Sequence, residues 1–131
     1  LRLAAVTGER SYEDHAVRVL RLFARPAVQH PDAFGHYLQA LDFHLSPVRE
    51  VALVAPANGA DASTPLAELA AVVWAAHRPH VVLSGGPEGS DRPELIRDRA
   101  AVEGKPAAYV CEHFACKAPV TEPKELEAAL V

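Results

Sequence analysis

Two cysteines and a histidine near the carboxyl end are the residues of this chain whose types best suit chemistry. Cys111 and Cys116 are the only cysteines, and His113 lies between them. The four-residue gap between the cysteines differs from the two-residue gap of thioredoxin-like redox sites. A chain that turns back after Cys111 could still bring the two alpha carbons within the ~7 Å that a disulfide requires. We expect two reduced thiols, at least one of them filling core volume, with a redox or regulatory disulfide as the alternative.

The same three residues also form a weak set of zinc-type ligands. A catalytic zinc site needs three protein ligands, whereas a structural site needs four. Side chains alternate along a strand, so Cys111 and His113 share a face only if the strand continues past Cys111. His77 or His80 could complete the set only through tertiary proximity. We therefore expect no bound metal, and a surface histidine beside a packed thiol.

Two small, polar loops are the candidate ligand-binding segments. They follow the first two expected strands, at the edge where open parallel sheets bind ligands and helix amino termini favour anions. Neither loop has the glycine spacing of a dinucleotide-binding motif or the glycine-lysine-serine or threonine sequence of a phosphate-binding loop. Small-anion or nucleotide binding is thus an alternative to ordinary connecting loops. The candidate residues are Asn58, Gly59, Ser63, Thr64, Ser84, Gly85 and Gly86.

The other charged and aromatic residues fit structural roles. Acidic pairs lie near expected helix starts, where the helix dipole favours negative charge. Arg18, Arg21 and Arg25 form a solvated stripe on one helix. No histidine belongs to a recognisable triad, and we expect Trp74 to anchor packing in the core or between segments. The sequence therefore identifies no catalytic residue and implies no cofactor.

The elements that must position these residues fall into two groups. In the first group, apolar residues recur at helical spacings of three and four. This pattern predicts a helix that terminates at Gly8, a helix from about Ser11 that ends before Pro26, and a helix from Pro31 that ends before Pro47. Residues 1–48 are therefore predicted to be helical.

In the second group, short apolar runs alternate with helical patterns. We expect strands at residues 51–55, 81–83 and 107–111, with helices beginning near Pro65, Pro93 and Pro123. Such alternation is typical of parallel sheets with right-handed crossovers. The sequence therefore predicts an α/β fold for residues 49–131: a small three-stranded parallel Rossmann-like sheet with flanking helices. The preceding helical pair is expected to cover one face of this sheet.

The composition is that of a globular chain without a charge bias. Half of the 131 residues are hydrophobic and the net charge is −4, so a core can form and no basic face suggests a nucleic-acid partner. No stretch approaches the ~20 apolar residues of a membrane helix, and the first residues do not have the charged, apolar and small-residue regions of a secretion signal. We therefore expect a cytoplasmic protein without a membrane partner. Because the chain starts at Leu1 and has no methionine, we also expect a piece of a longer, bacterial-type protein.

Residues 108–121, AYVCEHFACKAPVT, resemble the closing motif of the YyaL-like thioredoxin-domain family, whose animal members are spermatogenesis-associated proteins. The helix-rich start and the segment Pro47–Val51 are also similar to that family's last third. The resemblance implies a parent with an amino-terminal thioredoxin-like domain and a helical α/α toroid, whose final helices would be residues 1–45. The thioredoxin-type site belongs to parts outside this chain, so no site residue is carried over.

Together these observations favour a non-catalytic structural or interaction module at the carboxyl end of a larger thioredoxin-domain protein. The expected partner is the rest of the parent chain, and apolar surface left by its removal predicts self-association of the isolated piece. One alternative is a fragment of an enzyme, to which the loop from Cys111 to Cys116 contributes a thiol or metal site. Another is a domain that binds a small anion or nucleotide.

Overall fold

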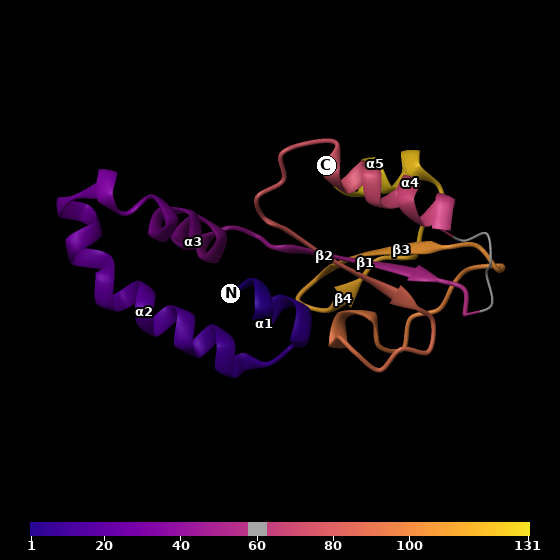
Figure 1. Cartoon of the computed structure of the whole chain (residues 1–131), viewed down its shortest axis with the longest axis horizontal. Helices are drawn as coiled ribbons and strands as arrows, with labels where there is room; N and C mark the ends of the chain where they lie inside the picture. Colours follow the sequence, from indigo (N-terminus) through magenta and orange to yellow (C-terminus); the bar gives the residue numbers. More distant parts are fainter. Residues whose placement is uncertain (58–62) are drawn as a thin grey trace.

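A computed structural model describes residues 1–57 and 63–131 and places three amino-terminal helices beside an α/β unit (Figure 1). The first part consists of α1 (Arg2–Thr7), α2 (Arg10–Gln29), the 3₁₀ turn η1 (Pro31–Ala33) and α3 (Gly35–Leu45). The second part consists of β1 (Arg49–Ala55), α4 (Ser63–Trp74), β2 (Val81–Pro87), the 3₁₀ turn η2 (Glu94–Ile96), β3 (Ala107–Glu112), β4 (Ala115–Cys116) and α5 (Pro123–Ala129). We call residues 1–45 the helical arm.

The sheet has four strands and mixed directions, so the predicted three-stranded parallel sheet is wrong. Its strand order is β2-β1-β3-β4. β1 and β2 are parallel, as expected, but β3 is antiparallel to both β1 and β4. The described structure is therefore an α/β unit in which only β1, α4 and β2 follow the predicted topology.

The connection from β2 to β3 explains the reversed direction of β3. A parallel strand needs a crossover that returns the chain to the starting edge, usually through a helix. Residues 88–106 instead contain the short turn η2, where we expected a helix from Pro93. The chain stays at the carboxyl edge of β1, where Ala107 pairs with Val54. β3 must then run back along β1 in the opposite direction.

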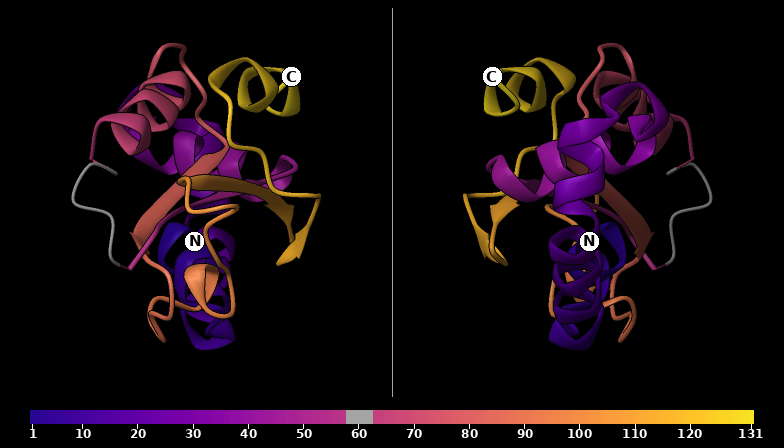
Figure 2. Two further views of the ribbon diagram at one scale, coloured as in Figure 1. Left: turned by 90° about the vertical axis from the view of Figure 1, so that its right-hand side faces the viewer. Right: turned by 90° about the vertical axis from the view of Figure 1, so that its left-hand side faces the viewer.

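The two faces of the sheet have different covers, as Figure 2 shows. Alternate residues of β1 and β3 point to opposite faces. On one face, Val51, Leu53 and Val110 pack with leucines from α4 and α5. On the other face, Ala52 and Cys111 pack with the leucine and isoleucine of η2. α1 contacts the second side through β2 and η2, so α1 and the cysteine hairpin share this face. The expected helical pair, α2 and α3, instead extends away from the sheet (Figure 1).

The close approach of η2 requires a glycine in β2. The Cδ1 atom of Ile96 would lie 2.8 Å from a Cβ atom at position 86, which is closer than carbon atoms normally approach. Gly86 therefore lets η2 pack directly on the sheet. Ser84, Gly85 and Gly86 all pair with β1, so the predicted loop after Leu83 starts later than expected. Backbone groups of β1 form hydrogen bonds with the backbone of β2, and these bonds do not depend on the side chains of β2. The strand can therefore continue through its two glycines.

The helical arm has little core of its own. α2 continues through Pro26 to Gln29, although we expected it to end before this proline. In α2 and α3 only Leu20, Ala27 and Phe43 are buried. Contacts between the helices hold them together: the Tyr37 hydroxyl donates to the carbonyl oxygen of Leu20 at 2.8 Å. α2 thus has a buried residue beyond its proline, and tertiary packing of that end outweighs the local preference to stop.

Polar contacts attach the arm to the α/β unit. The Arg2 guanidinium donates to the carbonyl oxygens of Pro79 and Val81, at 2.5 and 3.0 Å. The same guanidinium lies 4.7 Å from the centre of the Phe43 ring. His80 Nε2 lies 2.6 Å from Asp42 Oδ2. These contacts place both ends of the arm beside the start of β2.

Trp74 does not anchor the core, contrary to our expectation. Trp74 is the last residue of α4, and 73% of its surface is exposed. The helix buries Leu69 and Val73 instead, and the next position along a helix turns about 100° away from the packed face. Within the described residues, no helix is both long and apolar enough to cross a bilayer.

Candidate functional site

The hairpin formed by β3 and β4 brings the two cysteines together. The strands are joined by His113 and Phe114, which both have positive φ angles, 50° and 63°. Cys111 therefore lies directly opposite Cys116, with alpha carbons 3.9 Å apart, and the two sulfurs form a disulfide. The expectation of two reduced thiols is thus wrong for this structure, although Cys111 does fill core volume as expected, with 1% of its surface exposed.

The disulfide also changes the interpretation of the weak metal set. Both sulfurs are bonded to each other, and β3 ends before His113. The three residues therefore do not form a ligand set in this state. Across residues 1–57 and 63–131, no three histidine, cysteine, aspartate or glutamate side chains lie close enough to hold a metal ion.

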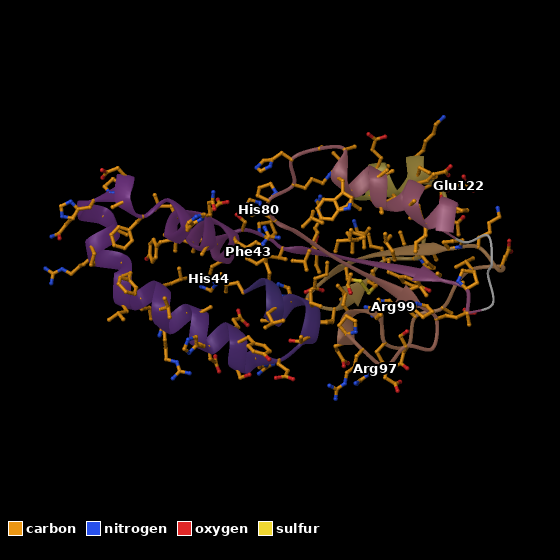
Figure 3. The ribbon with its side chains drawn as sticks, in the orientation of Figure 1. Phe43, His44, His80, Arg97, Arg99 and Glu122 are labelled. Atoms are coloured by element: carbon orange, nitrogen blue, oxygen red, sulfur yellow. A yellow bond between two sulfur atoms is a disulfide. The ribbon has the colours of Figure 1, made fainter. Side chains whose placement is uncertain are left out.

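Arg99 is the charged residue nearest to the disulfide. Its Nη2 atom donates to Cys116 Sγ at 2.8 Å and lies 3.5 Å from Cys111 Sγ. The loop from η2 to β3 carries this side chain back over the hairpin, and the guanidinium lies 5.8 Å from the centre of the Tyr109 ring. Figure 3 shows Arg99 close to the sheet and Arg97 farther out on the same loop. The loop thus places a permanent positive charge beside both sulfurs.

Glu50 lies beneath the hairpin and is the only buried charged residue that the structure describes. It is 4% exposed, and its Oε2 atom accepts a 2.7 Å hydrogen bond from the backbone N–H of Phe114. Burial raises the pKa of this carboxyl, although the N–H of Phe114 and the charges of His113 and Arg99 act in the opposite direction. Glu50 pairs with Cys111 across β1 and β3, so both side chains point to the same face of the sheet.

A cleft with several charged side chains in its walls adjoins the hairpin on this face. Its volume is ≈ 900 Å³, and α1, the start of α2, the end of α3, and the β3–β4 turn contribute to its walls. Glu50, Glu94 and His113 line the cleft, and His44 faces it from α3. The carboxyl and imidazole groups could exchange protons with a small molecule, but the described residues contain no nucleophile activated by a neighbouring base in this cleft.

The structure describes five of the seven predicted binding residues, and all five belong to regular elements. Ser84, Gly85 and Gly86 are part of β2, and Ser63 and Thr64 begin α4. Asn58 and Gly59 lie outside the described residues. At this edge the Glu88 carboxylate accepts hydrogen bonds from the backbone N–H groups of Ala57 and Ala101, both at 3.1 Å. These two donors are therefore already paired with an internal anion.

Sequence reasoning identified both cysteines but missed Arg99, Glu50 and β4. Glu50 had a signal, because it is a charged residue at the start of an apolar run that was expected to be buried on both faces. Arg99 had none, since its contacts join residues 12 and 17 positions apart through a loop. The His113–Phe114 turn also lacks the asparagine or glycine that usually indicates positive φ.

Comparisons with known proteins find weak similarity over the whole chain. This chain is 25% identical over 132 residues to spermatogenesis-associated protein 20 of Homo sapiens. It is 23% identical to the protein of the same name from Rattus norvegicus. Each alignment covers 99% of this chain but 17% of the relative. No family model and no solved structure matches the chain. The chain therefore corresponds to one segment of much longer proteins, and these mammalian relatives give no support to the expected bacterial origin.

Proposed function

We propose that this chain is a non-catalytic interaction module of a longer protein, and that the helical arm docks onto the rest of that protein. The single observation that carries the proposal is the arm's exposed apolar surface. Except for Trp74 and Val131, all the large hydrophobic side chains exposed in the described structure belong to the arm: Leu3, Tyr12, Val19, Leu22, Phe23, Val28, Leu38 and Leu45. The surfaces of monomeric soluble proteins rarely concentrate apolar residues in this way.

The docking surface is an apolar groove between α1, α2 and α3. Its volume is ≈ 790 Å³, and its lining includes Leu3, Val19, Phe23, Phe34 and Phe43. Phe23 and Phe34 pack against each other, with ring centres 6.2 Å apart, so the groove has a preformed aromatic wall. A groove between helices of this kind fits the apolar face of another helix.

The length of the relatives supports the choice of occupant. Because this chain aligns with 17% of each relative, a longer protein would have ample further residues to fill the groove. We assign the occupant to the helices that precede this segment in the same polypeptide. A parent with a thioredoxin-like domain and a helical toroid, as the closing motif suggests, would supply such helices. Self-association of the isolated chain through the same groove is the expected consequence of their removal.

Binding in trans tests this proposal. The chain and the preceding part of the longer protein would be purified separately, and their affinity would be measured by calorimetry. Val19→Glu puts a charge into the groove, where Val19 is 40% exposed. Burying an unpaired charge at an interface costs about 3 kcal/mol or more, so we expect a loss of affinity of about 100-fold.

Ala24→Glu is the matched control because it puts the same charge on the same helix outside the groove. Ala24 is exposed, does not line the groove and is not one of the large apolar side chains named above. We expect this variant to bind within about twofold of the original chain, as surface substitutions usually do. If the original chain does not bind, or if both glutamate variants bind equally well, the proposed docking surface is wrong.

A further inference from the structure

We propose that Cys111 and Cys116 form a redox-active disulfide that exchanges with external thiols, and that Arg99 stabilises the thiolate formed on reduction. This activity is separate from docking by the helical arm, because neither the two cysteines nor Arg99 line the docking groove. The proposal depends on three features: unequal exposure of the two sulfurs, the position of the guanidinium, and a buried carboxyl opposite the inner cysteine.

The two cysteines differ in their access to solvent. Cys116 is exposed in the short strand β4, whereas Cys111 is 1% exposed and packs with Leu95 and Ile96. An external thiolate can therefore reach Cys116 but not Cys111. Since β4 pairs with β3 through two residue pairs, the disulfide can open without separating β1 from β2 or β3. This difference in access determines which sulfur is attacked and which sulfur leaves.

Arg99 provides the charge that makes reduction favourable. Its guanidinium contacts both sulfurs, and its Nε atom is buried without a hydrogen-bond partner in the described structure. The described ion pairs do not include Arg99, although its charge does act on the buried carboxyl of Glu50. A nearby cation lowers a cysteine's pKa and favours the thiolate. The guanidinium would therefore stabilise a negative charge that forms on either sulfur.

Glu50 is placed to exchange a proton with the inner cysteine. It is opposite Cys111 on the same face of the sheet, where paired residues have Cβ atoms about 5 Å apart. The hydrogen bond from Phe114 fixes its carboxyl group below the hairpin turn. Burial raises the carboxyl pKa, which brings it closer to the pKa of a thiol and so eases proton transfer between the two groups. Glu50 can then protonate a departing thiolate and accept the proton when the disulfide forms again.

The reaction has two exchange steps. The thiolate of an external thiol attacks Cys116 Sγ, and a mixed disulfide forms as the bond to Cys111 breaks. Cys111 leaves with the electron pair beside Arg99 and takes a proton from Glu50. A second external thiolate then attacks the external sulfur of the mixed disulfide, which releases Cys116 as a thiolate. Two external thiols are oxidised to one disulfide, and the protein disulfide is reduced by two electrons.

The test is a redox titration of the whole chain in buffers of reduced and oxidised glutathione. Alkylation of the free thiols followed by mass spectrometry gives the fraction reduced at each ratio. Arg99→Gln removes the charge, while Arg99→Lys keeps a positive charge. The matched control is Arg97→Gln, because Arg97 pairs with Glu94 on the same loop and does not contact either sulfur.

We expect the original chain to be reduced reversibly with its helical and strand signal intact. For half reduction, Arg99→Gln should need an about tenfold higher ratio of the squared concentration of reduced glutathione to the concentration of oxidised glutathione, which corresponds to one unit of thiolate pKa. Arg99→Lys should recover part of this shift, and Arg97→Gln should remain within about twofold of the original chain. In a Cys111→Ala background, Arg99→Gln should also raise the apparent pKa for alkylation of Cys116.

Three outcomes would overturn the proposal. The pair could stay bonded in every glutathione buffer, or reduction could unfold the chain, which would make the disulfide a structural crosslink. Equal shifts in Arg99→Gln and Arg97→Gln would show that the guanidinium beside the sulfurs has no specific effect. None of these results would bear on docking by the arm, so the two proposals fail separately.

Discussion

Leu126→Ala should destabilise the chain far more than Leu22→Ala, although both changes remove the same atoms from a helix. Leu126 is 0% exposed on α5 and packs with Val51, Leu53 and Val110 in the core. Truncation of a buried leucine to alanine costs about 2–5 kcal/mol, through lost burial and the cavity that remains. Leu22 is 71% exposed, so its truncation should change stability by less than about 0.5 kcal/mol.

The structure makes α5 especially sensitive to this change. The helix has seven residues, which is too short to be stable alone. Its place on the sheet depends on Leu126 and Leu130, which are both buried. A loss of about 2–5 kcal/mol is a large part of the total stability of about 5–15 kcal/mol that is usual for a domain.

Urea unfolding followed by circular dichroism would measure both effects by linear extrapolation. We expect a much lower midpoint for Leu126→Ala and an unchanged midpoint for Leu22→Ala. Equal midpoints for the two variants would refute the conclusion that the α/β unit supplies the stability and that the exposed face of the arm supplies little.

Three further predictions concern individual side chains. Burial raises the pKa of Glu50 above 4.5 in the folded chain, so stability should fall as the pH rises from the ordinary carboxyl pKa through the raised one. Urea midpoints of Glu50→Gln should lose this pH dependence. Urea midpoints of Glu112→Gln, which changes an exposed carboxyl, should keep it. Gly86→Ala would overpack a buried isoleucine of η2 and should cost about 1–3 kcal/mol in the same assay, while Gly35→Ala, with open space around it, should cost nothing. Trp74 should fluoresce like free tryptophan and be quenched fully by acrylamide, because it is 73% exposed; a blue-shifted, protected emission would contradict this position.

The positions of the main strands could be predicted because each buried strand corresponds to a short run of apolar residues in the sequence. The apolar runs at residues 51–55 and 107–111 lie within β1 and β3. Gly8 also ends α1 in the left-handed conformation that was expected, with φ 72°. These features depend on residues that are near each other in sequence, so spacing alone can indicate them.

The direction of β3 and the disulfide hairpin depend on geometry that the sequence pattern does not contain. An antiparallel β3 follows from a connection without a crossover helix, and the expected helix from Pro93 suggested the opposite. The turn uses positive φ angles at His113 and at Phe114, and a bulky residue such as phenylalanine rarely adopts this conformation. Tertiary contacts, including the hydrogen bond from Phe114 to Glu50, stabilise this turn, and no local signal predicts them.

Hydrogen–deuterium exchange of α2 tests the proposed docking of the helical arm most directly. Exchange would be compared between the isolated chain and the longer protein, with β1 and β3 as internal references because they are paired within the sheet. We predict fast exchange of α2 in the isolated chain, diluted until it is monomeric, and strong protection in the longer protein, while β1 and β3 are protected in both. Equal exchange of α2 in the two proteins would contradict the account.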